Sequence, residues 1–330
     1  MSVGVGLGGN VNVTGATNCV PPSFDSQPVV TAPAGLLVGE DVVVSVSTSG
    51  TAVAISYQWQ RDGVDIGGAT GSSYTQTTSD IGPELTCVVT LTGACGAVSQ
   101  SSTGVQWTGP ADTFGSDLIW DYDAGTLSTV GTAVQTWTDL SGRGNDIAAV
   151  APGNRPTLVA GATPNGYDAV QFDGTAQYLV NAGVSFGGAL TDVVRFLVVR
   201  TDSYVSGRRY VDYRSGNWSA SQSGVADQKT TTVVGVGTST TTTAVTGSFE
   251  IWGFNLDADT RETWLNGVQE DLDGPSPLMN VLDSAALSVG GSNAGGVLCP
   301  MTLARCFAAR RAATTQELTT VSAGLDYLYL

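Results

Sequence analysis

Hydrophobic and polar residues alternate with a period of two over several short stretches of this 330-residue chain. The clearest stretches lie in residues 42–47, 55–60 and 85–92, where valine, isoleucine, leucine and aromatic residues occupy every second position. Such alternation is typical of a β-strand with one buried face. Asp62-Gly63 follows the second stretch and predicts a two-residue hairpin turn. Short strands separated by turn signals predict a β-sandwich in this part of the chain.

The rest of the chain repeats the pattern on a larger scale. Strands are predicted around residues 118–124, 134–138, 169–173, 196–200, 232–236, 249–256, 263–265, 287–290 and 302–307, and Asn266-Gly267 predicts another hairpin. A turn-rich break at residues 108–112 separates the two regions. We therefore expect an N-terminal arm at residues 1–24, a small domain at 25–109 and a larger domain at 112–330.

One helix is predicted, at the C-terminus. Thr314 and Glu317 have the spacing of a capping box. Leu318, Val321, Leu325 and Leu328 then repeat on one face of a helix. We expect this helix to pack on the larger domain and to have a structural role.

Three segments of the small domain are specific: Tyr57-Gln58-Trp59-Gln60-Arg61-Asp62-Gly63, Ser79-Asp80-Ile81-Gly82 and Leu85-Thr86-Cys87-Val88-Val89. Together they give this domain a resemblance to a bacterial or phage immunoglobulin-like domain. It implies that Trp59 is the buried tryptophan of the sandwich and that Cys87 stands at one of the two cysteine positions. Val46 occupies the other cysteine position and Leu85 that of the corner tyrosine, so no inter-sheet disulfide is expected. We expect Cys87 to be a small buried thiol rather than a reactive one.

The most specific segment of the larger domain is Trp137-Thr138-Asp139-Leu140-Ser141-Gly142-Arg143-Gly144-Asn145, preceded by Leu118-Ile119-Trp120-Asp121. With these segments the larger domain resembles a concanavalin A-like (laminin-G-like) jelly roll, a domain that recurs in phage virion proteins and bacterial surface proteins. The predicted fold class is therefore all-β, with an Ig-like β-sandwich followed by a concanavalin A-like jelly roll and one short C-terminal helix. Trp120 and Trp137 lie within strand patterns and are expected in its core.

Composition narrows the chemistry. The chain has no histidine, which excludes histidine-based acid–base catalysis and histidine zinc sites. Its net charge of −16 would repel a phosphate backbone, so we expect no nucleic-acid partner. No apolar stretch approaches the roughly 20 residues of a spanning helix, so no membrane insertion is expected. Residues 1–14 lack both positive charge and a continuous apolar run, and do not resemble a secretory signal.

Neither an enzyme nor a cofactor is expected. Glucanases share the jelly-roll fold, but hydrolysis needs two carboxyl groups set close together, and the few glutamates here do not cluster. Asp121 with Asp123, and Asp139 with Asn145 and Asp146, are candidates for calcium, which is bound by oxygen ligands. The alternative is that these side chains cap turns, as Asp and Asn commonly do.

Aromatic residues mixed with arginine mark the candidate glycan-binding segment. It contains Tyr204, Arg208, Tyr210, Tyr213, Arg214 and Trp218, between predicted strands. Aromatic residues and arginine are enriched at recognition surfaces. The alternative is a partly buried loop.

The N-terminal arm and the cysteines leave further alternatives open. Residues 10–14 alternate like a strand, so the arm either adds a strand to a neighbouring subunit or is a flexible tail. Five cysteines leave at least one thiol unpaired within the chain, and Cys19 with Cys95 is a candidate pair.

These features together predict a non-enzymatic structural and binding protein on the exterior of a tailed-phage particle. It would be a head decoration or fibre-type protein, made in the host cytoplasm, that contacts other capsid or tail proteins, copies of itself and host-surface glycans. The alternative is a bacterial surface adhesin or a carbohydrate-binding accessory domain of an extracellular protein. Both functions rest largely on likeness of fold.

Overall fold

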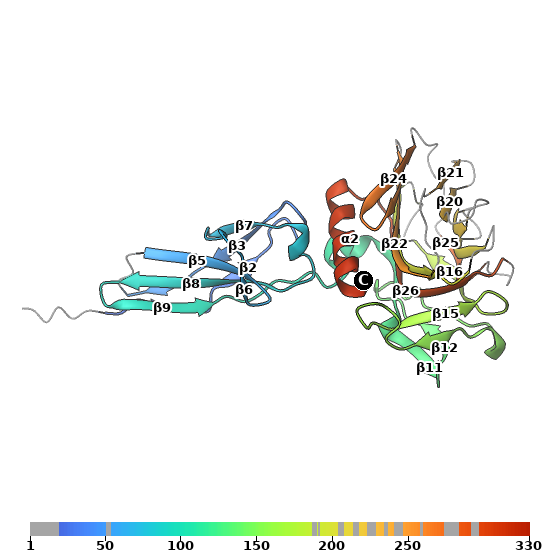
Figure 1. Ribbon diagram of the computed structural model, residues 1–330, viewed down its shortest axis with the longest axis horizontal. Helices are drawn as coiled ribbons and strands as arrows, with labels where there is room; N and C mark the ends of the chain where they lie inside the picture. The colour runs from blue at the N-terminus through green and yellow to red at the C-terminus, as the bar shows by residue number, and fades with distance from the viewer. Residues whose placement is uncertain are drawn as a thin grey trace, which may run out of the picture. The chain divides into compact units, whose positions relative to one another are not determined.

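The computed structural model describes residues 20–50, 54–186, 190, 192–203, 208–213, 218–222, 229–233, 237–240, 247–257, 260–273, 284–291 and 297–330. This part of the chain forms two compact units (Figure 1). The smaller unit holds the residues up to Pro33, Asp41–Tyr74 and Glu84–Val105. The larger unit holds Ala34–Glu40, Thr75–Pro83 and Gln106–Leu330. Two short segments that precede residue 84 in the sequence therefore pack with the larger unit.

The smaller unit is built from antiparallel strands in separate sheets. A three-stranded sheet has the order β2 (Val29–Thr31), β3 (Asp41–Ser45) and β7 (Ser73–Thr75). A four-stranded sheet has the order β6 (Val64–Asp65), β5 (Ala54–Arg61), β8 (Leu85–Gly93) and β9 (Gly96–Ser101). The short strands β1 (Ser23–Phe24) and β4 (Thr48–Ser49) pair with each other. Asp62 and Gly63 both have positive φ, so the hairpin predicted between β5 and β6 is present.

Trp59 and Cys87 lie opposite each other in β5 and β8, and both are fully buried. The indole nitrogen of Trp59 donates to the carbonyl of Gly71 at 2.9 Å. Cys87 is a free thiol. Burial raises the pKa of this thiol to about 11, which keeps it protonated and unreactive at neutral pH. Ile55, near the start of β5, is 42% exposed, so the buried face of this strand is shorter than its alternation predicts.

The larger unit is a continuous antiparallel network of strands. Its elements are β10 (Leu118–Asp123), β11 (Leu127–Val130), β12 (Ala133–Trp137), β13 (Ile147–Ala148), β14 (Thr157–Val159), β15 (Ala169–Asp173), β16 (Leu179–Ser185), β17 (Val193–Thr201), β18 (Arg209–Tyr213), β19 (Trp218–Gln222), β20 (Lys229–Val233), β21 (Gly237–Thr240), β22 (Phe249–Leu256), β23 (Arg261–Leu265), β24 (Val268–Asp273), β25 (Ser284–Val289), β26 (Pro300–Ala309), and the helices α1 (Ala111–Phe114) and α2 (Thr315–Tyr329). Single-turn 3-10 helices add η1 (Thr78–Asp80), η2 (Gly115–Asp117), η3 (Ala124–Thr126) and η4 (Pro152–Asn154). This architecture confirms the predicted all-β class with one short C-terminal helix.

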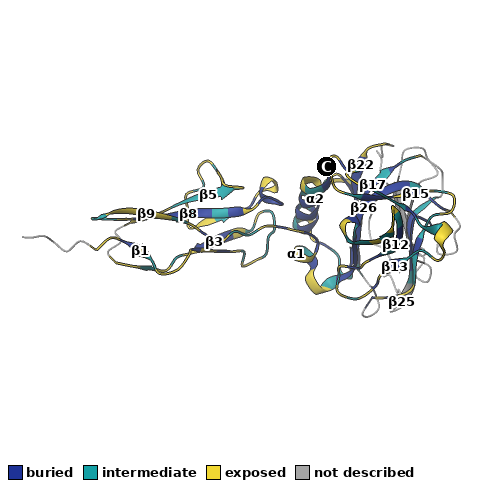
Figure 2. Cartoon of the chain, turned by 90° about the horizontal axis from the view of Figure 1, so that it is seen from below, coloured by how far each residue is buried: buried dark blue, intermediate teal, exposed yellow. Residues whose placement is uncertain are grey.

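The strand pairings define two layers. The first contains β26 paired with β17 along one edge and with both β10 and β15 along the other, and it continues through β22, β23 and β24. The second has the order β16, β25, β18, β19, β20, β21. Strands β12, β13 and β14 connect the two layers. Figure 2 shows that β17 and β26 are buried over most of their length.

The core of the larger unit is rich in tryptophan. Trp120, Trp137, Trp252 and Trp264 are all buried. Their rings, with many leucine, valine and phenylalanine side chains, form one hydrophobic cluster. The predicted hairpin at Asn266-Gly267 is also present, with positive φ at both residues. No helix in the described parts of the chain is long and apolar enough to cross a membrane.

Helix α2 packs one face on the strands. Leu318, Val321 and Leu325 are fully buried and Leu328 is partly buried, as their spacing predicts. Gly324 lies on the buried side, where the ring of Trp107 packs directly against its backbone. A β-carbon at position 324 would overlap that ring. The glycine is therefore required by close packing, at the expense of helix propensity.

Replacing Gly324 with alanine should destabilise the protein. In an open helix this change adds about 0.5–1 kcal/mol of stability, but overlap with Trp107 should cost about 1–3 kcal/mol. We expect a net loss in the free energy of unfolding, measured by urea denaturation. Gly183→Ala is the matched control, because a β-carbon there meets no atom within 4 Å. A Gly324→Ala protein more stable than wild type would contradict this account of the packing.

Candidate functional site

The aromatic segment predicted to bind glycans is only partly described. Tyr204 and Arg214 lie outside the described residues, and Tyr213 and Trp218 are described only as backbone in β18 and β19. Arg208 is half-buried.

Tyr210 corrects the prediction for this segment, because it belongs to the core. It is 1% exposed, and its hydroxyl is 2.7 Å from that of Thr201. Its ring meets Trp252 edge-on, with centroids 5.7 Å apart. The pairing of β18 with β19 shifts register between Arg209 and Val211, so strict alternation does not hold at Tyr210. A ring buried in this way cannot stack on a ligand.

The predicted calcium ligands Asp139, Asn145 and Asp146 organise a loop. The carboxylate of Asp139 accepts hydrogen bonds from the backbone amides of Asp121, Ser141 and Asn145 at 2.9 Å each, and from the Ser141 hydroxyl at 2.7 Å. Asp146 accepts from the backbone amide of Asp139 at 2.8 Å. These oxygens satisfy backbone donors, which is the turn-capping role.

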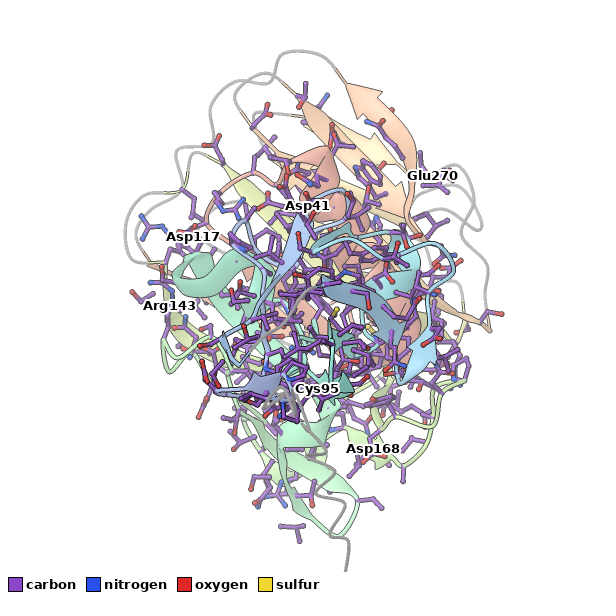
Figure 3. The ribbon with its side chains drawn as sticks, turned by 90° about the vertical axis from the view of Figure 1, so that its left-hand side faces the viewer. Asp41, Cys95, Asp117, Arg143, Asp168 and Glu270 are labelled. Atoms are coloured by element: carbon purple, nitrogen blue, oxygen red, sulfur yellow. The ribbon has the colours of Figure 1, made fainter. Side chains whose placement is uncertain are left out.

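Asn145 and Arg143 fasten the same loop to neighbouring strands. The side-chain amide of Asn145 donates to the carbonyls of Ile119 and Ser185 and accepts from the backbone amide of Ser185. Arg143, labelled in Figure 3, donates to the carbonyl of Leu118. Within the described ranges, no three Asp, Glu or Cys side chains are grouped so as to hold a metal ion. The segment that carried the jelly-roll resemblance is therefore a structural loop in this chain.

A buried ion pair joins the first and last strands of the larger unit. Arg305 on β26 donates to both carboxylate oxygens of Asp121 on β10, at 3.0 and 2.7 Å, and the two side chains are almost fully buried. Arg305 also lies 3.2 Å from Asp123, which accepts a hydrogen bond from the hydroxyl of Tyr329 at 2.6 Å. Burial would lower the pKa of the guanidinium, but Asp121 holds that pKa above its ordinary value. For Asp121, burial prevails and raises the pKa of the carboxyl, although Arg305 lowers it. The bidentate contact is the geometry of a charged carboxylate–guanidinium pair, and on that geometry we assign both groups as charged.

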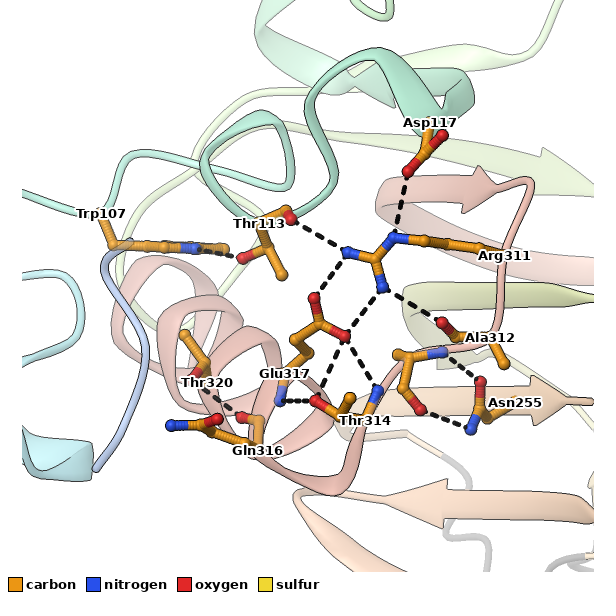
Figure 4. Close-up of polar contacts among 11 residues, drawn as sticks. Trp107, Thr113, Asp117, Asn255, Arg311, Ala312, Thr314, Gln316, Glu317 and Thr320 are labelled. Carbon is orange, nitrogen blue, oxygen red and sulfur yellow. Dashed lines mark hydrogen bonds and ion pairs between the residues drawn. The ribbon is translucent and has the colours of Figure 1, made fainter. Parts of the chain in front are cut away.

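A second ion-pair cluster fixes the start of α2 (Figure 4). Arg311 donates to both carboxylate oxygens of Glu317, at 2.8 and 2.5 Å, and to Asp117 at 3.1 Å. Glu317 also accepts from the backbone amide of Thr314, and the hydroxyl of Thr314 accepts from the amide of Glu317, so the predicted capping box is present. Arg311 lies over the ring of Phe114, 5.0 Å from its centroid.

A pocket of about 280 Å³ lies in the larger unit beside the other end of α2. It is lined by Thr78, Ser79, Ile81, Ala323, Asp326 and Tyr327. No sequence pattern predicts this pocket, because the residues that line it come from two segments about 240 positions apart. Tyr327 and Asp326 lie on the polar side of the predicted helix, where charged and aromatic residues usually have no special role.

Comparisons with known proteins found only distantly similar structures. A scan of family profiles and a search of curated proteins found no match. Among solved structures, domain 4 of AbnA, an extracellular GH43 arabinanase from Geobacillus stearothermophilus, in complex with arabinotriose, has a TM-score of 0.47 at 13% identity, covering 62% of this chain and 98% of that domain. Trypanosoma rangeli sialidase in complex with sialic acid has a TM-score of 0.48 at 12% identity, covering 87% of this chain and 47% of the sialidase.

The binding domain of botulinum neurotoxin serotype G has a TM-score of 0.43 at 11% identity, covering 62% of this chain and 50% of that one. The chain thus spans about half the length of the sialidase and of the neurotoxin domain. At this level of similarity, the function has to be argued from the residues of the chain itself.

Breaking the pair between Asp121 and Arg305 should strongly destabilise the protein. Arg305→Met leaves the buried carboxylate of Asp121 uncompensated, which should cost about 3–5 kcal/mol. Asp121→Asn should cost less, because Arg305 keeps its contact with Asp123 at 3.2 Å. The free energy of unfolding in urea measures this loss. The matched control is Asp202→Asn, because Asp202 pairs with Arg200 at the same 2.7 Å but in a more exposed position, where the cost should stay below about 1 kcal/mol. Equal losses at the two pairs would contradict the role assigned to burial.

Glu317 should make stability depend on pH in acid. Burial raises the pKa of Glu317, but hydrogen bonds from Arg311 and Thr314 outweigh it and lower that pKa. The ionised carboxylate of Glu317 then contributes its full share to the free energy of unfolding above the ordinary pKa of about 4.3. This contribution is lost as the pH falls through the lowered pKa. Glu317→Gln should reduce stability at pH 7 and flatten its decline below pH ~4. Glu84→Gln, at an exposed position, should keep the wild-type profile; the same flattening there would contradict the assignment.

Proposed function

We propose that the protein is a non-enzymatic binding protein on the exterior of a tailed-phage particle. In this proposal the N-terminal arm and the small domain anchor it to other virion proteins, and the larger unit faces the medium and binds host-surface glycans. Single contacts would be weak, and many copies on one particle would raise the avidity. The resemblance of the sequence to domains of phage virion proteins supports a location on a phage particle. The roles of the acidic residues support binding rather than catalysis.

The observation that carries the proposal is how five of the six buried carboxylates among the described residues are used. Asp80, Asp121, Asp139 and Glu317 each accept hydrogen bonds from backbone amides or from arginine within the fold. Asp212 forms an ion pair with Arg209 at 2.6 Å. A glycosidase instead directs two carboxyl groups at its substrate. Acids held in this way serve folding, which favours a structural and binding role.

Cys95 supports a location outside the cell. It lies in the turn between β8 and β9 (Figure 3) and is disulfide-bonded, whereas its predicted partner Cys19 lies outside the described residues. Disulfides persist in oxidising surroundings and are rare in the cytosol. The disulfide fits a virion surface, and it fits equally the alternative of a bacterial surface adhesin or extracellular accessory domain.

The proposal predicts that the protein co-purifies with virions and that its arm is needed for incorporation. Deleting residues 1–20 should remove the protein from particles purified on a density gradient, as measured by mass spectrometry. The control replaces residues 1–18 with a glycine–serine segment of equal length, which tests whether the arm sequence or only its length matters. Full incorporation of the deleted form would refute anchoring by the arm. Recovery of the wild type in the envelope of uninfected bacteria, and not in virions, would favour the adhesin.

A further inference from the structure

The pocket beside α2 has an aromatic wall that is held in place. Tyr327 is 44% exposed, and its ring packs on the backbone of Gly82, whose φ of +104° and lack of a side chain leave room for it. The side-chain amide of Asn165 donates to the carbonyl of Tyr327 at 2.9 Å. All these residues belong to the larger unit. A ring fixed on a helix in this way loses little conformational freedom when a ligand binds.

Two further lining residues carry hydroxyl groups and belong to a braced turn. Thr78 and Ser79 belong to η1, which begins with a capping box in which Asp80 accepts from both the backbone amide and the hydroxyl of Thr77, at 2.7 Å each. Ile81 and Ala323 supply apolar surface, and Asp326 supplies a carboxylate. The pocket thus combines one ring face, apolar contacts and a few polar groups, as small-molecule sites usually do.

Volume and charge restrict the ligand. A pocket of about 280 Å³ is slightly smaller than usual ligand sites, which span roughly 300–1,000 Å³. It has room for about one sugar ring. A pyranose offers C–H groups to an aromatic face and hydroxyl donors to a carboxylate. Asp326 and the net charge of −16 disfavour an acidic sugar.

We propose that this pocket binds a single neutral monosaccharide ring, stacked on Tyr327 and hydrogen-bonded to Asp326, Thr78 and Ser79. The inference rests on the proposed glycan-binding function and moves the site from the 204–218 segment to the end of α2. It also predicts that the protein prefers neutral sugars to acidic ones.

Saturation-transfer NMR on the full-length protein tests this site, with methyl β-D-galactopyranoside, methyl β-D-glucopyranoside and N-acetylneuraminic acid as probes. At least one neutral glycoside should bind in the millimolar range, and N-acetylneuraminic acid should not bind. Tyr327→Ala should weaken binding about tenfold, whereas Tyr327→Phe keeps the ring and should stay within about twofold. Asp326→Asn should weaken binding a few-fold.

Tyr167→Ala is the matched control, because Tyr167 is 43% exposed but does not line the pocket. It should bind like wild type, and thermal unfolding verifies that each variant is folded. Unchanged binding by a folded Tyr327→Ala protein, preference for N-acetylneuraminic acid, or no binding of either neutral glycoside would overturn the pocket assignment.

A glycan array probed with a multivalent wild-type form separates the two proposals. Binding there leaves the proposed function standing, and its absence refutes glycan binding as a whole.

Discussion

The buried pair between Asp121 and Arg305 is the contact on which the larger unit depends. Its partners are 184 residues apart in the sequence, on the first strand of the unit and on the strand that precedes the C-terminal helix. Removing two charges from water is costly, and only a bidentate geometry with further partners offsets that cost. Arg305 has both oxygens of Asp121 and a second carboxylate in Asp123. The main effect of the pair is therefore to specify that β10 and β26 are neighbours. Its net contribution to the free energy of unfolding is the smaller effect.

The same network extends to helix α2 and explains why its surface can carry a binding site. At one end Arg311 and Glu317 fix the first turn, and at the other Tyr329 donates to Asp123, the carboxylate that also faces Arg305. Burial raises the pKa of the Tyr329 hydroxyl, so it remains a donor at neutral pH. A helix held at both ends presents Asp326 and Tyr327 in fixed positions. The proposed sugar site is thus supported by interactions that lie outside it.

The sequence predicted those features that depend on local patterns. Alternation predicted the strands, Asn266-Gly267 predicted a hairpin, and Thr314 with Glu317 predicted the start of the helix, because each signal lies within a few residues. The acidic loop was compatible with either calcium binding or turn capping, because Asp and Asn side chains are common in both. Only the backbone amides that donate to Asp139 in the folded chain identify turn capping. Tyr210 looked like a recognition residue and is core. The pocket had no local signal, because residues 78–81 meet residues 323–327 only in the folded chain.

Hydrogen exchange measured by mass spectrometry under native conditions tests most directly whether β10, β26 and α2 form one cooperative structure. If the ion pairs join them as described, peptides from 118–123, 300–309 and 315–329 should open with the same free energy, close to that of global unfolding. Variation of the denaturant concentration identifies that common opening. Exchange of the 315–329 peptide at a much lower free energy than the two strands would contradict the account, because the helix would then not be held by the network that supports the proposed pocket.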